Sequence, residues 1–163
     1  MFDREFKVYA FLLDYGRSLA ADIDDARFAE QPAPGLNPPA WQFAHLATTA
    51  DMALALLGER PTLAEDWRAT FGPGSKPSAD RSSYPPKEEL LGLWGEAHAR
   101  FAAAASDTSD RRLEHPNPLK IAPIVRAFPT VGDLVAHLLT SHEAMHLGQL
   151  SSWRRQVGLP YLF

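Results

Sequence analysis

The sequence predicts an all-α protein, a four-helix bundle with long connections after the second and third helices. Four segments repeat apolar residues every three or four positions, the period of one face of an α-helix. No segment alternates apolar and polar residues as a half-buried strand would. A chain of 163 residues is long enough to bury a substantial core. We therefore expect a single domain over residues 1–163.

The first helix is expected over roughly residues 2–23. Its inner stripe recurs every three or four positions and consists of Phe2, Phe6, Tyr9, Leu13, Ala20 and Ile23. Phe11, Leu12 and Leu19 form a second apolar edge on this helix. That edge leads us to expect a homodimer, unless these side chains all lie inside the bundle.

The second helix is expected to follow Asn37, because asparagine is a good N-cap and the next two residues, both proline, are tolerated in a first helical turn. Gly58 is a natural stop at its C-terminal end. Thr62 and Glu65 have the spacing of a capping box, which predicts a short helix to about Phe71. Residues 72–86 are rich in Gly, Pro and Ser and predict a loop.

The third helix is expected from about Lys87 to Ala105. Its inner stripe consists of Leu90, Trp94, Ala97 and Phe101. Residues 106–129 contain four prolines, which block a long helix. Connections of this length in a compact domain are often functional or disordered.

The fourth helix is expected to begin at Thr130, where Asp133 completes a capping box, and to end near Val157. Polar residues interrupt its otherwise apolar face. At α-helical spacing that face consists of Leu134, Leu138, His142, Met145, His146, Gln149 and Trp153. Buried polar groups are costly without partners, so the two histidines and the amide need a shared explanation.

Composition excludes several classes of protein. The chain has no cysteine, which rules out disulfides, thiolate metal sites, iron–sulfur clusters and a cysteine nucleophile. The formal charge of −4 and the lack of a basic cluster argue against a nucleic-acid partner. No segment resembles a signal peptide or approaches the roughly 20 apolar residues that span a bilayer. We expect a cytoplasmic protein without membrane contact.

His142 and His146 lie one helical turn apart, a spacing at which two imidazoles can bind one divalent ion. Residues 142–146 also match H-E-x-x-H, the signature of zinc proteases. Those enzymes take their third protein ligand from downstream, but residues 147–163 contain no His, Asp, Glu or Cys. We therefore expect a third ligand from upstream and no peptidase activity.

His45 is the best upstream candidate, because it lies on the second helix among apolar neighbours, one turn after Trp41. Facing helices of a bundle commonly build metal sites in this way. The alternative is that each histidine simply makes hydrogen bonds in the core. His98 lies just off the stripe of the third helix, and His115 precedes a proline in a loop. His137 is rotated by roughly 140° from His142 in an α-helix and should face away.

Two further residues are candidates for a catalytic or supporting role. Glu143 is rotated by about 100° from His142. Its alternative roles are a general base, a partner that supports a ligand histidine, or a solvated side chain without a function in the site. Gln149 lies one turn beyond His146. Ligated imidazoles usually donate their second N–H, so Gln149 could orient a ligand histidine.

The chain resembles the DinB-like (DinB/YfiT-like) superfamily of metalloenzymes. Residues 41–46 (WQFAHL) and 140–150 (TSHEAMHLGQL) carry the resemblance, together with the order of the four helices, so that it covers nearly the whole chain. It implies a four-helix bundle that is a mirror variant of simple up-and-down topology. It also implies a divalent metal, zinc or nickel, bound by His45, His142 and His146. Several relatives act on low-molecular-weight thiols, as S-transferases or as an isomerase, and related domains contribute to ergothioneine biosynthesis.

Three neutral imidazoles leave the metal its full positive charge and at least one open position, as in catalytic zinc sites. Such an ion deprotonates a bound thiol and lowers the pKa of a bound water to about 7. Three functions therefore remain open: a small-thiol-dependent S-transferase, a metal-dependent hydrolase and a non-catalytic metal-binding module. We favour the first, with zinc ahead of nickel.

The surroundings of the metal should discriminate among these functions. A basic, aromatic pocket would favour the transferase, because small thiols carry acidic groups. A carboxylate aligned on bound water would favour the hydrolase, and a site closed by a fourth ligand or by Trp41 would favour the binding module. We expect both long connections near the mouth of the site. Their cations, which could meet a small-molecule substrate or thiol, are Lys76, Arg81, Arg111, Arg112 and Lys120.

Overall fold

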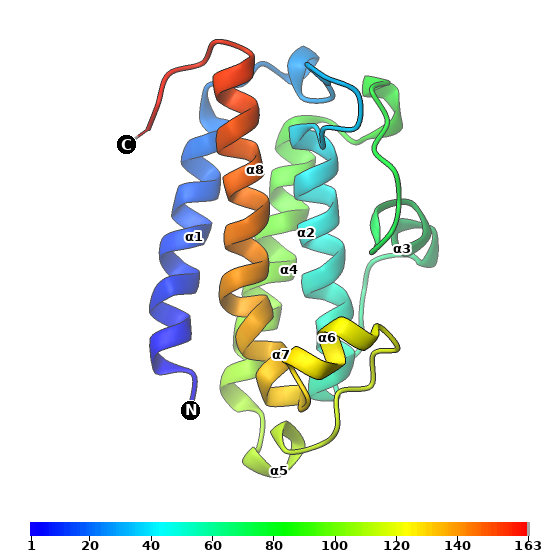
Figure 1. The fold of residues 1–163 in the computed structure, drawn as a ribbon, viewed down its shortest axis with the longest axis vertical. Coiled ribbons are helices and arrows are strands. Elements are labelled where there is room, and N and C mark those ends of the chain that lie inside the picture. Colours follow the sequence, from blue (N-terminus) through cyan, green and yellow to red (C-terminus); the bar gives the residue numbers. More distant parts are fainter. Residues whose placement is uncertain (163) are drawn as a thin grey trace.

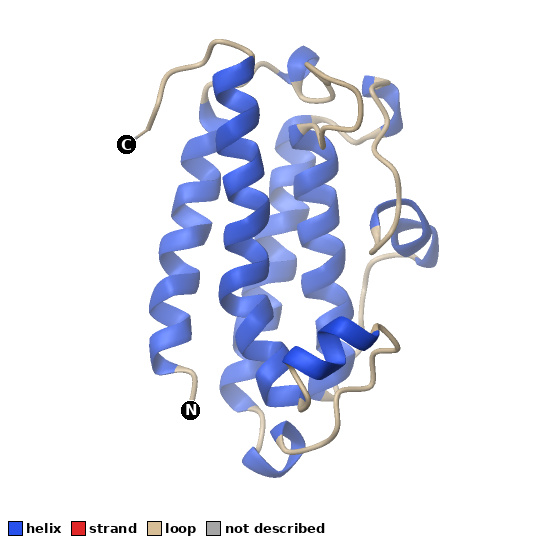
Figure 2. Ribbon diagram, in the orientation of Figure 1, coloured by secondary structure: helices blue, strands red, loops and turns tan. Residues whose placement is uncertain are grey.

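Four long helices packed side by side form the body of the protein (Figure 1). The computed structural model describes residues 1–162, and every regular element within them is helical (Figure 2). The long helices are α1 (Asp3–Ala21), α2 (Pro39–Ala53), α4 (Lys87–Asp107) and a last helix that comprises α7 (Val131–His137), η4 (Leu138–His142) and α8 (Glu143–Gln156). The short elements are η1 (Asp25–Arg27), η2 (Leu54–Leu57), α3 (Glu65–Phe71), η3 (Arg81–Ser83), α5 (Asp110–Leu113) and α6 (Ala122–Ala127). The predicted all-α bundle is confirmed.

The directions of the helices explain the two long connections. α1 and the last helix run in one direction, and α2 and α4 run in the opposite one (Figure 1). Because α2 and α4 are parallel, residues 58–86 must return along the length of the bundle, and they carry α3 on the outer side of α2 (Figure 1). Within residues 1–162, no helix is both long and apolar enough to cross a membrane.

The second connection stays at one end of the bundle and folds back on itself. Val131 N donates to His115 O at 2.8 Å, and Asn117 N donates to Pro129 O at 2.9 Å. The side chain of Asn117 also donates to Phe128 O at 2.8 Å. These bonds close the loop that contains α6 and hold it against the start of the last helix. The predicted capping box of Thr130 and Asp133 starts that helix as expected.

The predicted N-cap of α2 is wrong. Pro38 occupies the capping position, and no side chain caps the helix. Proline lacks an N–H, so the first turn has fewer donors that need a cap. Asn37 instead donates through its side chain to Gln149 Oε1 at 3.0 Å and so connects the start of α2 to α8.

The predicted capping box of α3 is also wrong. Ala64 precedes the helix without capping it through a side chain. The backbone N and hydroxyl of Thr62 donate instead to Oδ1 of the buried Asp51, at 2.8 Å and 3.0 Å. A carboxylate in α2 therefore holds the beginning of the long connection, and the Thr62 hydroxyl is not free to cap a helix.

The core lies between the four long helices and contains the whole predicted stripe of α4. Leu12 and Leu19 on α1 are also buried, so the predicted second apolar edge is wrong for these two residues. α1 contacts both α4 and the last helix, and it therefore needs a wider apolar face than one stripe. Phe11 remains 57% exposed.

A homodimer stays a prediction that now depends on Phe11 and its exposed neighbour Val8. We expect light scattering at micromolar concentration to give the mass of two chains, because pairing would remove these side chains from water. The mass of one chain would contradict this expectation.

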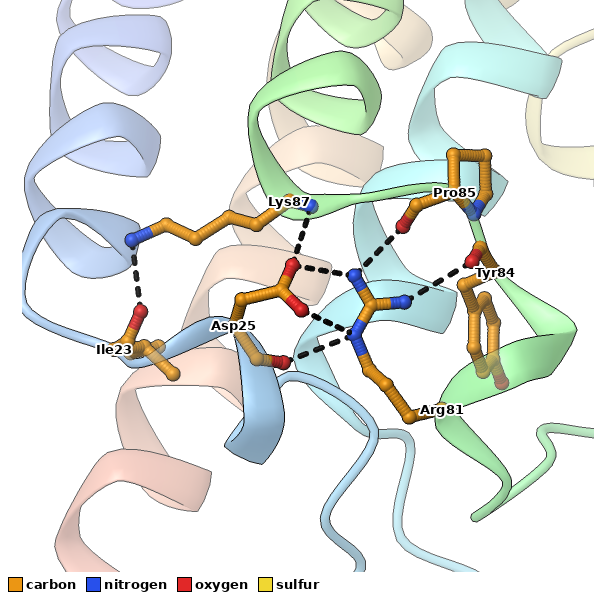
Figure 3. A network of polar contacts seen from close by, with 6 residues as sticks. All are labelled: Ile23, Asp25, Arg81, Tyr84, Pro85 and Lys87. Atoms are coloured by element: carbon orange, nitrogen blue, oxygen red, sulfur yellow. Dashed lines mark hydrogen bonds and ion pairs between the residues drawn. The ribbon is translucent and has the colours of Figure 1, made fainter.

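A polar network joins the α1–α2 connection to the segment before α4 (Figure 3). The Arg81 guanidinium donates to the Asp25 carboxylate and to the carbonyl oxygens of Tyr84 and Pro85, at 2.5–3.1 Å. Lys87 N, at the start of α4, donates to Asp25 Oδ1 at 2.6 Å. The hydrogen bond from Arg81 is the main reason why the pKa of Asp25 is lowered. Arg81 is therefore committed to structure at this end of the bundle.

Candidate metal centre

Three histidines from two helices converge beside the core. His45 comes from α2, His142 ends η4 and His146 lies one turn into α8. One ring nitrogen from each lies within 4.8 Å of the other two. The ring centroids of His45 and His146 are 4.7 Å apart, and those of His142 and His146 are 4.8 Å apart. The structure thus brings together the three side chains that the sequence predicted as a set.

The surroundings of His45 fit a metal ligand. Its Nδ1 atom donates to the carbonyl oxygen of Phe71 at 2.7 Å, which leaves the lone pair of Nε2 available. A carbonyl oxygen behind the ring is the usual support of a metal-bound histidine. Trp41 stacks on the same ring at a centroid distance of 4.7 Å, and its indole N–H donates to Ser75. Backbone and indole together fix the orientation of the imidazole.

All three rings are held in the neutral form that binds metals. Burial lowers the pKa of His45. Burial also lowers the pKa of His142 to about 2 and that of His146 to about 4, with neighbouring histidines contributing to both shifts. A neutral imidazole has a free lone pair, and three of them suit a divalent ion of the zinc type. The residues therefore fit the implied metal.

The last helix contains a π-helical turn, η4, that ends at His142, the first histidine of the pair. This wider turn forms hydrogen bonds between residues five apart, so it contains one residue more than an α-helical turn. The buried face of α8 consequently consists of Glu143, Leu147, Leu150, Trp153 and Arg154. Glu143, Leu147, Leu150 and Arg154 each follow a residue of the predicted stripe by one position, and Trp153 belongs to both faces. The prediction that Met145 and Gln149 face inward is wrong, because both are exposed.

The same turn explains the position of His137. Five residues span the π-helical turn, so His137 lies next to His142, with ring centroids 5.8 Å apart. The prediction that His137 faces away is wrong, because the rotation of 140° assumed an α-helix. His137 is buried, stacks on Phe128 at 4.2 Å and forms a hydrogen bond with Ser141 Oγ at 2.6 Å. The only sequence signal for the position of His137 beside His142 was the spacing of five residues between them, which matches a π-helical turn.

Glu143 is buried and pairs with a histidine of another helix. Its Oε2 atom lies 2.9 Å from Nε2 of His98 on α4, and both side chains are at most 2% exposed. Tyr9 on α1 stacks on His98 with ring centroids 5.5 Å apart. Burial, together with the nearby Glu143 carboxylate, raises the pKa of Tyr9. The interpretation of Glu143 as a solvated side chain is wrong. The pair connects α4 to the last helix.

Gln149 lies on the surface of α8, one turn beyond His146. Its Oε1 atom accepts the hydrogen bond from Asn37 described above. The residue therefore connects α8 to the start of α2, the helix that carries His45.

Two of the three histidines, His45 and His142, line a cavity of about 380 Å³ together with Trp41, His137 and aliphatic side chains. As predicted, both long connections contribute, through residues 73–74 and through Leu119, Ile121 and Ile124. A larger hollow of about 490 Å³ lies near η2 and the end of α4, and none of these histidines lines it.

The predicted basic lining is absent from this cavity. No lysine, arginine or carboxylate is among its described lining residues. Arg81 is held by Asp25 at the end of the bundle, as Figure 3 shows. Arg112 lines the other hollow and donates to Leu56 O at 3.4 Å. For these two residues, the predicted place near the metal is wrong.

Residues 13–150 match the family model of the DinB superfamily. The chain belongs to the DinB superfamily. The match includes all three histidines and the L-G-Q-L segment that follows them. The fold of this DinB protein is similar to the crystal structure of a conserved protein from Enterococcus faecalis, with a TM-score of 0.77 and 18% identity over 96% of each chain. At that identity the likeness concerns the fold alone. No curated protein matches the sequence.

Proposed function

We propose that this DinB protein is an enzyme that binds one divalent metal ion through His45, His142 and His146 and activates a low-molecular-weight thiol for transfer to a small molecule. The observation that carries the proposal is the convergence of three neutral imidazoles, two of which (His45 and His142) line a cavity, with no fourth His, Asp or Glu in the cluster within the described residues. We propose zinc ahead of nickel. When bound, the ion supplies a positive charge that lowers the pKa of a thiol or water at its open position.

The side chains around the site support this role. The Phe71 carbonyl and the stacked Trp41 ring orient His45 before any ion binds. The aliphatic wall of the cavity keeps the surroundings poor in water, which strengthens the attraction between a cation and an anionic sulfur. Such preorganised surroundings need no rearrangement when the thiol loses its proton.

The geometry argues against both rival functions, although the basic lining expected for thiol transfer is also absent. A hydrolase would need a carboxylate aligned on bound water, but Glu143 pairs with His98 and no carboxylate is among the described residues that line the cavity. A non-catalytic module would need a closed site. Trp41 lines the cavity together with the histidines, so it leaves His45 and His142 accessible from that side.

Titration of the cobalt-substituted protein with soluble thiols tests this proposal. We expect sulfur-to-metal charge-transfer absorption at millimolar thiol, because the open position of the ion should accept an anionic sulfur. The matched alcohols should give no such band, and neither should the His142→Ala variant. If no thiol produces the band in the wild-type protein, the proposed thiol chemistry is wrong.

We expect no peptidase activity despite the H-E-x-x-H motif. Glu143, which would have to activate water in a zinc protease, is bonded to His98 in the core. The measurement is cleavage of a peptide library by the zinc-loaded protein, with a chelated sample as the control. Cleavage that requires metal and is lost in Glu143→Gln would refute this expectation.

A further inference from the structure

We propose that the acceptor substrate is an uncharged hydrophobic molecule whose apolar group occupies the cavity beside the histidines. This inference depends on the proposed function, because it assumes that the ion held by His45 and His142 borders this cavity. It changes the expected substrate class. The sequence suggested a basic pocket for acidic groups, whereas the structure shows an apolar one.

The polar atoms on the cavity wall are few, and several of them already have partners within the protein. The Thr49 hydroxyl donates to the backbone oxygen of Leu46 at 3.1 Å. Nδ1 of His45 is bonded to a carbonyl, and Nδ1 of His137 is bonded to a serine. The rest of the wall is mainly aliphatic, with Met52, Leu56, Leu134 and Leu138 from α2, η2 and the last helix. Among the described residues, no cation on the wall can pair with a carboxylate or a phosphate.

The charge and the size of a ligand decide whether it can occupy this cavity. An unpaired carboxylate in apolar surroundings is strongly disfavoured, while an apolar group gains free energy on leaving water. An engineered apolar cavity of about 150 Å³ binds benzene. A cavity of about 380 Å³ therefore has room for a substituted aromatic ring or a branched alkyl group.

Two apolar side chains at the mouth of the cavity are partly exposed. Leu119 and Ile121 line the cavity, yet they remain 36% and 45% exposed. They belong to the connection before α6, which the backbone bonds of residues 115–117 hold beside the last helix. A hydrophobic ligand would cover these exposed side chains, whereas a charged ligand would gain nothing from them.

Fluorine NMR with two ligands of matched shape tests this proposal. The probes are para-fluorobenzyl alcohol, which is uncharged, and para-fluorobenzoate. Each is titrated into the full chain as purified, and again after chelation so that the carboxylate cannot coordinate a metal. In the chelated sample we expect the benzoate to bind roughly tenfold more weakly than the alcohol.

Ile121→Lys places a cation at the mouth and should remove this preference, by weakening the alcohol and strengthening the benzoate. Leu162→Lys is the matched control, because Leu162 is 37% exposed and lies outside the cavity lining. Equal binding of the two probes, or a preference that Ile121→Lys leaves unchanged, would overturn the proposal. Because this result is read without metal, it is independent of the cobalt titration, which tests the thiol chemistry.

Discussion

Replacing His142 by alanine should reduce the metal content from about one ion per chain to a small fraction. His142 is one of only three histidines in the cluster within the described residues. The two imidazoles that remain should hold a divalent ion only weakly. Loss of a supporting group around a metal ligand already lowers affinity by about 10–100-fold, so loss of a ligand should exceed that range. Elemental analysis of the purified proteins gives the measurement.

His115→Ala is the control, because His115 is an exposed histidine outside the cluster. It should retain the metal content of the wild-type protein. His45→Ala and His146→Ala should both resemble His142→Ala. If His142→Ala and the wild-type protein contain equal amounts of metal, the proposed site is wrong.

Replacing Glu143 by alanine should lower the free energy of unfolding by about 3–5 kcal/mol, the usual result of removing one partner from a buried ionisable pair. The variant leaves the buried His98 without its partner. Total stabilities are only about 5–15 kcal/mol, so the variant should be close to unfolding. Denaturant titration of chelated protein measures the change without a contribution from metal binding.

A second variant separates loss of the pair from loss of volume. The double variant Glu143→Leu, His98→Leu removes both polar partners, and it should recover much of the lost stability. Glu96→Ala is the control, an exposed glutamate on α4 that should change stability by less than about 0.5 kcal/mol. A cost as small for Glu143→Ala as for Glu96→Ala would show that the pair does not stabilise the bundle.

The helices and the histidine set could be predicted because they depend on short-range periodicity. His142 and His146 are one turn apart whatever precedes them, and His45 belongs to a face marked by Trp41. The features that were missed depend on partners far away in the sequence. Glu143 is buried because His98 lies on another helix. The hydroxyl that was expected to cap α3 bonds instead to a carboxylate in α2.

The charge around the site was mispredicted for the same reason. Arg81 belongs to a connection that does reach the cavity, but Asp25 holds the arginine from 56 positions away in the sequence. Composition reveals which cations a connection contains. It does not reveal which of them the fold has already neutralised.

The π-helical turn η4 determines which side chains of the following helix, α8, face the core. In an uninterrupted α-helix, His142 would continue the buried face that begins with Val131, about 100° away from Glu143. The imidazole would then point into the core, and Glu143 would lose its place opposite His98. One extra residue in one turn thus separates a polar cluster inside the core from a histidine group that borders a cavity.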